Sequence, residues 1–166
     1  MRATAAGMTL IEVLVTIAIV SVLVAVASPS FTEVVRLNRL DASTLDLRAA
    51  LDLARSEAIK RAGVVVVEPI PAGNWTGVLR VYVDTAQNPA NNRTGADPIV
   101  RQFDAMTGMT TTGGPARIAF DRRGNNMALV VGGNPIVSTI SFCKSPNQRA
   151  LQVDRAGFMT TSDGSC

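Results

Sequence analysis

The segment that most constrains this chain is residues 8–28, MTLIEVLVTIAIVSVLVAVAS, which is apolar almost throughout and carries a single charge, at Glu12. A helix rises about 1.5 Å per residue, so a helix of this length spans a hydrocarbon core of about 30 Å. A continuous apolar surface of this size is unfavourable when it is exposed to water. We therefore predict one helix that is covered either by lipid or by neighbouring copies of the same kind of helix.

Residues 1–7 form a short polar leader with one cation, Arg2. A basic residue before the apolar segment predicts that the amino terminus stays in the cytoplasm and that the rest of the chain lies outside it. The alternative is a secretory signal cleaved between Ala25 and Pro29, but the apolar run is long for such a signal.

Glu12 is the unusual residue of the apolar segment, because a carboxylate placed in hydrocarbon costs free energy unless it finds a partner. The residues alone leave two interpretations open. Glu12 pairs with a cation from another group, or it lies close enough to the helix end to reach lipid headgroups or to become protonated.

A second helical stretch follows the apolar one and runs to residue 62. Pro29 predicts a bend at the junction, because proline removes a backbone hydrogen bond, and Gly63 is the expected end of the helix. Apolar or small side chains recur at helical spacing and predict one face packed on a core: Leu37, Leu40, Thr44, Leu47, Leu51, Ala54 and Ala58. Charged residues on the other faces are spaced for surface ion pairs: Arg48 with Asp52, Asp52 with Arg55, and Glu57 with Lys60 and Arg61.

From residue 63 the pattern changes to short β-branched runs between clusters rich in Gly, Pro, Asn and Asp, which predicts an antiparallel β-rich head. The expected strands are 64–67, 78–83, 99–103, 118–120, 128–131, 136–142 and 150–153. Segments 88–98 and 107–115 are the expected surface loops, and Trp75 is expected in the head core. The predicted fold class is α+β, with the long N-terminal helix packed on the antiparallel head.

The leader and the start of the helix resemble those of a known family. Gly7-Met8-Thr9-Leu10-Ile11-Glu12-Val13-Leu14, followed by the apolar helix and Pro29, resembles the class III leader of type IV pilins and type II secretion pseudopilins. The resemblance implies the pilin fold, cleavage between Gly7 and Met8 by a prepilin peptidase, and N-methylation of Met8. It also implies that Glu12 pairs with the terminal amine of a neighbouring subunit during filament assembly. Met8 departs from the phenylalanine that is usual in the family.

The resemblance divides the chain into four parts. These are a leader at 1–7, a membrane or filament-core helix at 8–28, an amphipathic helix half at 29–62 and a β-rich globular head at 63–166. The implied location is the bacterial inner membrane, with a single pass and the head in the periplasm, and afterwards the extracellular pilus.

The head resembles the GspH/FimT/FimU branch of minor pilins and pseudopilins. The residues that carry this resemblance are 53–61 with the following strand, Gly-Asn-Trp-Thr-Gly at 73–77, Phe-Asp-Arg-Arg-Gly at 120–124, and Leu-Gln-Val at 151–153 with Gly157. The implied function is that of a structural subunit that primes a type IV pilus or sits at its tip, in adhesion, twitching motility or DNA uptake. A GspH-like minor pseudopilin of a type II secretion system is the alternative. Implied partners are other minor pilins and the major pilin through the N-terminal helix, prepilin peptidase, inner-membrane lipid and a tip adhesin.

The two cysteines of the chain, Cys143 and Cys166, both lie in the part predicted outside the cytoplasm. An oxidising compartment favours a disulfide between them over a reactive thiol. The chain has no histidine, which excludes His-based catalysis and His-ligated metal sites, and no nucleophile with a base or phosphate-binding loop is present. We therefore expect a protein that is not an enzyme and has neither cofactor nor metal.

Basic residues outnumber acidic ones in the last third of the chain. Arg122, Arg123 and Arg155 are the candidates for a weak contact with DNA or another anion, because arginine binds phosphate. Some FimT-like relatives bind DNA through a Gly-Arg-x-Arg loop. The corresponding residues 157–160 are Gly-Phe-Met-Thr here, which argues against a DNA receptor.

Overall fold

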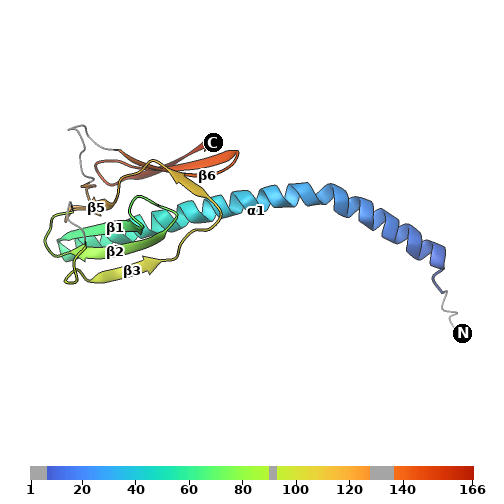
Figure 1. Cartoon of the computed structure of the whole chain (residues 1–166), viewed down its shortest axis with the longest axis horizontal. Coiled ribbons are helices and arrows are strands. Elements are labelled where there is room, and N and C mark those ends of the chain that lie inside the picture. Colours follow the sequence, from blue (N-terminus) through green and yellow to red (C-terminus); the bar gives the residue numbers. More distant parts are fainter. Residues whose placement is uncertain (1–6, 90–92, 128–136) are drawn as a thin grey trace, which may run out of the picture. The chain divides into compact units, whose positions relative to one another are not determined.

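The computed structural model of the chain describes the backbone of residues 7–89, 93–127 and 137–166, and their side chains apart from those of 26–30. One long helix, α1 (Leu10–Arg61), precedes the strands (Figure 1). The strands are β1 (Val64–Ile70), β2 (Val78–Asp84), β3 (Ile99–Phe103), β4 (Thr110–Thr112), β5 (Ile118–Phe120), β6 (Ser138–Lys144), β7 (Asn147–Val153) and β8 (Met159–Ser165). The chain divides into two compact units, Met1–Leu37 and Asn38–Cys166.

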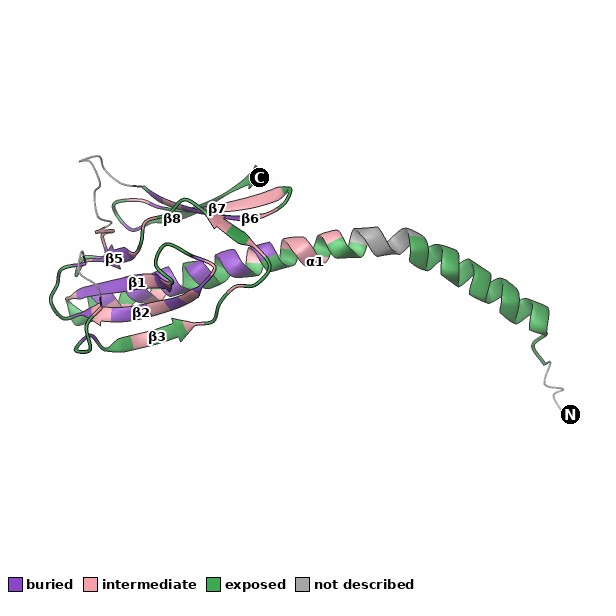
Figure 2. Cartoon of the chain, in the orientation of Figure 1, coloured by how far each residue is buried: buried purple, intermediate pink, exposed green. Residues whose placement is uncertain are grey.

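In the first unit the apolar part of α1 has no covering. Every side chain from Met8 through Ala25 is exposed, including large ones such as Leu10 and Ile11 (Figure 2). Within the described residues, no helix is both long and apolar enough to cross a membrane. The assignment of 8–28 as a membrane or filament segment stays a prediction. The helix α1 continues without a break through residue 29, and the bend expected at Pro29 also stays a prediction.

In the second unit α1 packs one face against the head, and the predicted stripe is confirmed from Leu40 onward. Its buried members are Leu40, Thr44, Leu47, Leu51, Ala54 and Ala58. As at many helix ends, the residue that follows the last helical turn has a left-handed backbone conformation. That residue is Ala62 (φ 51°) and not Gly63 as expected. The Gly63 N–H then reaches back to the Ala58 carbonyl oxygen at 3.1 Å.

The ion pairs on the exposed faces of α1 follow the predicted spacing with one exception. Arg48 pairs with Asp52 at 3.7 Å, and Glu57 pairs with Lys60 at 3.5 Å and with Arg61 at 2.6 Å. The hydrogen bond from Arg61 is the largest cause of the lowered pKa of Glu57, and the positive charges of Lys60 and Arg61 lower it further. Burial acts in the opposite direction but is outweighed. The predicted pair of Asp52 with Arg55 is wrong, because the Arg55 guanidinium points to the head instead.

The head consists of two antiparallel sheets, with strand orders β3-β2-β1-β5 and β4-β6-β7-β8. Alternate residues of the two sheets and the packed face of α1 form one core, which includes Val65, Val81, Phe120, Phe142 and Leu151. This alternation is the reason for the period-two pattern of the strands. Trp75 is also fully buried, as expected, and its indole N–H donates to the Pro115 carbonyl at 2.9 Å.

The predicted strands at 64–67, 78–83, 99–103 and 118–120 are confirmed, and those near 136–142 and 150–153 correspond to β6 and β7. The expected strand at 128–131 lies outside the described residues. Two strands contradict the prediction. β4 lies inside the expected loop 107–115, and β8 was not expected at all. Both are polar edge strands rich in threonine, and they lack the apolar alternation that marks a half-buried strand.

Candidate functional site

The start of α1 carries the residues of the predicted processing and assembly site. Thr9 precedes the helix and caps it: its hydroxyl oxygen accepts the Glu12 N–H at 3.3 Å, and its carbonyl accepts the Glu12 and Val13 N–H groups at 3.1 and 3.2 Å. Thr9 and Glu12 have the spacing of a capping box, in which a Thr at the cap is followed three residues later by Glu. Gly7 and Met8 stand directly before this cap and are exposed.

Glu12 has an exposed side chain in the first turn of α1, where a negative charge is favoured by the helix dipole. None of the ion pairs among the described side chains involves Glu12. The helix dipole therefore favours a carboxylate at this position in a single chain.

Arg55 is the residue that joins α1 to two turns of the head. Its Nε donates to the Gly124 carbonyl at 3.0 Å, and one of its terminal nitrogens donates to the Ala156 carbonyl at 2.9 Å. The guanidinium also lies 5.1 Å from the centre of the Phe158 ring, in a cation–π contact. These contacts explain why an arginine stands within the 53–61 segment that resembles the family.

The two glycines of these turns let the turns approach Arg55 and each other. Gly124 and Gly157 have φ of 80° and 77°, in the left-handed region. A Cβ on Gly157 would come within 2.2 Å of the Gly124 carbonyl oxygen. Gly157 is thus required both by the backbone conformation and by the closeness of the two turns.

The structure brings the three predicted anion-contact residues to these same two turns. Arg122 and Arg123 lie on the turn that ends at Gly124, and Arg155 lies on the neighbouring turn; all three are exposed. The Asn126 N–H donates to the Arg155 carbonyl at 3.0 Å, which ties the turns together.

Two shallow pockets open beside these arginines and share Asp121 and Met127. One is lined in addition by Asn125, Asn126, Arg155 and Ala156, and the other includes Gly63, Gln87, Arg122 and Arg123. Burial acts to raise the pKa of Asp121, but hydrogen bonds from Asn125 and from the Arg123 N–H outweigh it and lower the pKa. Asp121 therefore stays ionised beside the arginines, so the pockets are not a purely cationic site.

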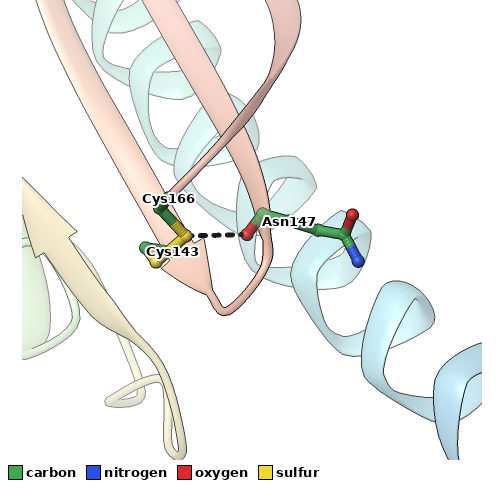
Figure 3. Close-up of a disulfide and its surroundings, with 3 residues drawn as sticks. All are labelled: Cys143, Asn147 and Cys166. Atoms are coloured by element: carbon green, nitrogen blue, oxygen red, sulfur yellow. Dashed lines mark hydrogen bonds between the residues drawn. A yellow bond between two sulfur atoms is a disulfide. The ribbon is translucent and has the colours of Figure 1, made fainter.

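The far end of the second sheet is fastened by a disulfide between Cys143 on β6 and Cys166, which follows β8 (Figure 3). Their Cα atoms are 6.1 Å apart. The Cys166 N–H donates to the Pro146 carbonyl at 3.0 Å, and Cys166 Sγ lies 3.2 Å from the Asn147 carbonyl oxygen. The expected disulfide is therefore present, and it holds the end of an edge strand to the middle of the sheet.

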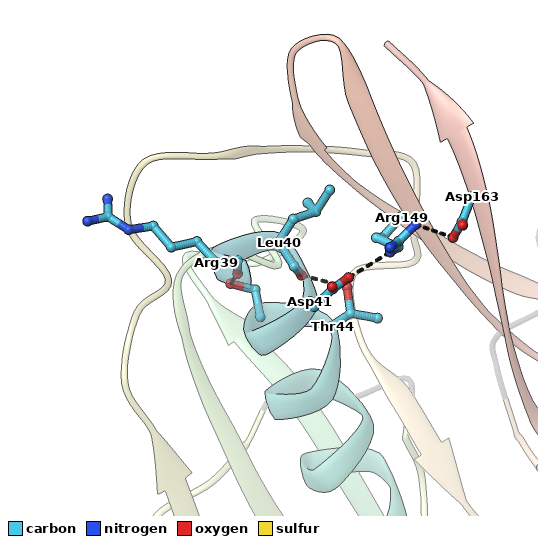
Figure 4. Close-up of polar contacts among 7 residues, drawn as sticks. Arg39, Leu40, Asp41, Thr44, Arg149 and Asp163 are labelled. Atoms are coloured by element: carbon cyan, nitrogen blue, oxygen red, sulfur yellow. Dashed lines mark hydrogen bonds and ion pairs between the residues drawn. The ribbon is translucent and has the colours of Figure 1, made fainter. Parts of the chain in front are cut away.

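Arg149 on β7 fastens the same sheet to α1. Its Nε donates to Asp41 on the helix at 2.7 Å, and it forms a second ion pair with Asp163 on β8 (Figure 4). The hydrogen bond from Arg149 to Asp41 is the largest cause of the raised pKa of Arg149. One cation is thus shared by two carboxylates.

Asp97 closes the loop between β2 and β3. One carboxylate oxygen accepts the Thr85 N–H and hydroxyl at 2.9 and 2.6 Å, and the other accepts the Thr94 N–H and hydroxyl at 2.7 and 2.9 Å. Hydrogen bonds to the ionised form, led by that from the Thr85 hydroxyl, hold the pKa of Asp97 far below its ordinary value.

Sequence reasoning missed the roles of Arg55, Arg149 and Asp97, because each acts on residues far away in the chain or across a loop. Only Arg55 left a signal, its place in the 53–61 segment that resembles the family, but its spacing from Asp52 predicted a surface ion pair instead. The other two have no local pattern that distinguishes them from surface charges.

Comparisons with known proteins agree with this geometry. The family described as type II transport protein GspH matches residues 43–157, and the prokaryotic N-terminal methylation motif matches residues 2–28. A crystal structure of the type IV minor pilin FimU of Pseudomonas aeruginosa strain PAO1, in space group P21, is similar with a TM-score of 0.60 and 22% sequence identity, covering 80% of this chain and 92% of that one. A crystal structure of FimU in space group P65 gives a TM-score of 0.57 and 22% identity, covering 74% and 92%. No curated protein matches the chain.

A long N-terminal helix packed on antiparallel sheets, with a methylation motif at its start, defines a pilin-like protein. The chain belongs to the GspH family of minor pilins and pseudopilins. At this sequence identity the likeness to FimU concerns the fold, and it confirms the pilin fold expected from the sequence.

Proposed function

We propose that the chain is a minor type IV pilin, a structural subunit that primes a pilus or sits at its tip. It is inserted in the inner membrane with its head in the periplasm, is cleaved between Gly7 and Met8 by a prepilin peptidase, and is methylated at Met8. It then enters the filament through its apolar helix, where it contacts the other minor pilins and the major pilin. Adhesion and twitching motility follow from its place near the tip and from a tip adhesin held there.

The observation that carries this proposal is the start of α1. A single carboxylate stands three residues after the cap of a helix whose side chains from Met8 to Ala25 are all exposed and almost all apolar. A chain with this surface needs lipid or similar helices around it. Cleavage after Gly7 would expose an amine four residues before Glu12, and a neighbouring subunit's amine would supply a cation to Glu12, which forms no ion pair with the described side chains of its own chain.

Replacement of Glu12 tests the proposal. We expect Glu12→Val to remain in the inner membrane and to be lost from pili sheared off the cells, because the unpaired amine of its neighbour would oppose docking. Thr16→Val is the matched control, since Thr16 lies one turn further along the same exposed helix and only bonds its own backbone, through the Val13 carbonyl at 2.8 Å. Incorporation of Glu12→Val at the level of the control would refute the proposal.

A second candidate, a minor pseudopilin of a type II secretion system, is favoured by the description of the matching family. The two functions share the same helix and differ in the machine that the subunit serves. Deletion of the gene distinguishes them: a pilin deletion reduces surface pili and leaves secretion intact, whereas a pseudopilin deletion blocks the release of exoproteins and leaves pili intact.

The DNA-receptor function is not part of the proposal. Arg122, Arg123 and Arg155 are gathered on adjoining turns, but Asp121 stands among them and stays ionised. We expect no salt-sensitive retardation of duplex DNA at low micromolar concentrations of the full chain in detergent. Binding that weakens steeply between two salt concentrations would restore that function.

A further inference from the structure

The unexpected strand β8 leaves one long edge of the second sheet unpaired. β8 is an outer member of the order β4-β6-β7-β8, and within residues 7–89, 93–127 and 137–166 no strand pairs with its other side. All of its residues after Met159 are exposed. It pairs with β7 in regular register over its whole length, from Val153 opposite Met159 to Asn147 opposite Ser165.

The hydrogen bonds at the two ends of this ladder fix which backbone groups face outward. Beyond one end the Asp154 N–H donates to the Phe158 carbonyl at 2.9 Å, and beyond the other the Cys166 N–H donates to the Pro146 carbonyl at 3.0 Å. Bonded and non-bonded pairs alternate in an antiparallel ladder. The even-numbered residues of β8 therefore bond β7, and Met159, Thr161, Asp163 and Ser165 direct their N–H and C=O groups to the open side.

This edge is held in place rather than left to fray. The disulfide of Cys166 with Cys143 fastens one end of β8 to β6, across β7 (Figure 3). Arg149 pairs with Asp163 from the neighbouring strand while it is itself bonded to Asp41 on α1 (Figure 4). A pre-ordered edge loses little conformational entropy when another strand is added.

The edge also lacks most of the features by which proteins prevent strand addition. Such features are prolines, charged side chains and above all lysines, bulges and very short strands, and of these β8 carries one charge, at Asp163. The sequence MTTSDGS contains neither proline nor lysine, and its ladder with β7 has no register shift. By contrast β4, at the opposite edge of the same sheet, has only three residues.

We propose that the open edge of β8 accepts an extended strand from the head of a neighbouring, different pilin subunit. The proposal rests on the proposed function, which supplies such neighbours. The only charge on β8 is Asp163, and it shares one arginine with a second carboxylate, so the cluster of Asp41, Arg149 and Asp163 keeps a net negative charge. An incoming strand with Lys or Arg opposite Asp163 balances that charge, whereas a second β8 would bring another carboxylate to the same face. The partner strand is therefore a β-branched or Thr/Ser-rich segment with one cation.

A proline at an outward-facing position tests this directly. Thr161→Pro removes one N–H from the open side and leaves the ladder with β7 intact, because proline is tolerated on an edge where its nitrogen faces away from the sheet. We expect the amount of this variant in sheared pili to fall roughly tenfold, from the lost hydrogen bond and the obstruction of the incoming strand. Thr161→Ala, which keeps the N–H, should be incorporated like the unaltered chain.

Folding of the variant is checked on the full chain in detergent, where Thr161→Pro should retain the disulfide and melt within a few degrees of Thr161→Ala. A photo-crosslinking amino acid that replaces Thr160 then identifies, in intact cells, the chain that lies against the open edge of β8. Crosslinks to a strand of another pilin head, absent in the Thr161→Pro background, support the proposal. Normal incorporation of folded Thr161→Pro, or crosslinks to β8 of a second copy, overturn it. The proposed function fails separately, if Glu12→Val is incorporated like its control.

Discussion

Gly157 is a residue at which the addition of a single methyl group is expected to lower the stability of the head strongly. An alanine there would adopt a left-handed backbone at φ 77° and place its Cβ 2.2 Å from the Gly124 carbonyl oxygen. We expect Gly157→Ala to lower the free energy of unfolding of the head by about 2–4 kcal/mol, from backbone strain and displaced turns. The measurement is a denaturant titration of the full chain in detergent. Gly95→Ala is the control, because a Cβ at Gly95 meets nothing within 4 Å, and it should change stability little.

Arg55 acts through its geometry as well as its charge. Arg55→Lys keeps the cation but cannot reach the Gly124 and Ala156 carbonyls with two separate nitrogens. We expect both Arg55→Lys and Arg55→Ala to destabilise the head, by about 1–3 kcal/mol, because carbonyl groups lose their donors. Arg48→Ala, which removes only an exposed ion pair at 3.7 Å, should cost less than about 1 kcal/mol. Equal effects of Arg55→Ala and Arg48→Ala would contradict the role given to Arg55.

Asp97 makes the stability of the head depend on pH. Its pKa is lowered in the folded chain, so its contribution is fully present above the unfolded value of about 4 and is lost as the pH falls below it. We expect Asp97→Asn to lower the melting temperature at pH 6 and to lose part of the drop that the unaltered chain shows between pH 6 and pH 3. Melting curves of both chains at the two pH values give the comparison. An equal fall in melting temperature between pH 6 and pH 3 in both chains would show that Asp97 does not cause the acid sensitivity.

At the scale of elements, the disulfide connects β6 to the end of β8. The bonded residues are 23 apart in sequence, and closing a loop of that length stabilises the folded state by about 3 kcal/mol through the unfolded chain. We therefore expect the Cys143→Ser/Cys166→Ser double variant to unfold at a lower denaturant concentration, with β8 losing amide-hydrogen protection before β1 and β2. Uniform loss of protection over both sheets would mean that the bond stabilises the head only globally.

The sequence predicted the elements whose side chains enter the core and missed those whose side chains do not. The α1 face from Leu40 to Ala58 carries apolar residues at helical spacing, and the strands β1, β2, β5, β6 and β7 carry apolar runs or alternations whose side chains enter the core, so their pattern reports their packing. β4 and β8 are edge strands whose stability comes from backbone hydrogen bonds to β6 and β7. Backbone hydrogen bonds do not require particular side chains, so they cannot be recognised from the residue types. Thr, Ser and Gly occur in loops as well as in edge strands.

The candidate site divides in the same way. Gly7, Met8 and Glu12 were assigned from a local motif, which a sequence can display in full. The grouping of Arg122, Arg123 and Arg155 around Arg55 depends on two turns that are distant in the chain meeting over one helix. Likewise Ala62, and not the glycine beside it, takes the left-handed end of α1, since the position in the last turn decides the conformation once the core has fixed the helix.

At the scale of the whole molecule, the account depends on a helix that is released at its front by proteolysis and then buried among similar helices. The most direct test is mass spectrometry of the chain recovered from sheared pili. The account predicts a chain that begins at Met8 and carries one added methyl group on its amine, with Cys143 and Cys166 still joined. A chain that retains Met1, or one trimmed near Ala27, would contradict it.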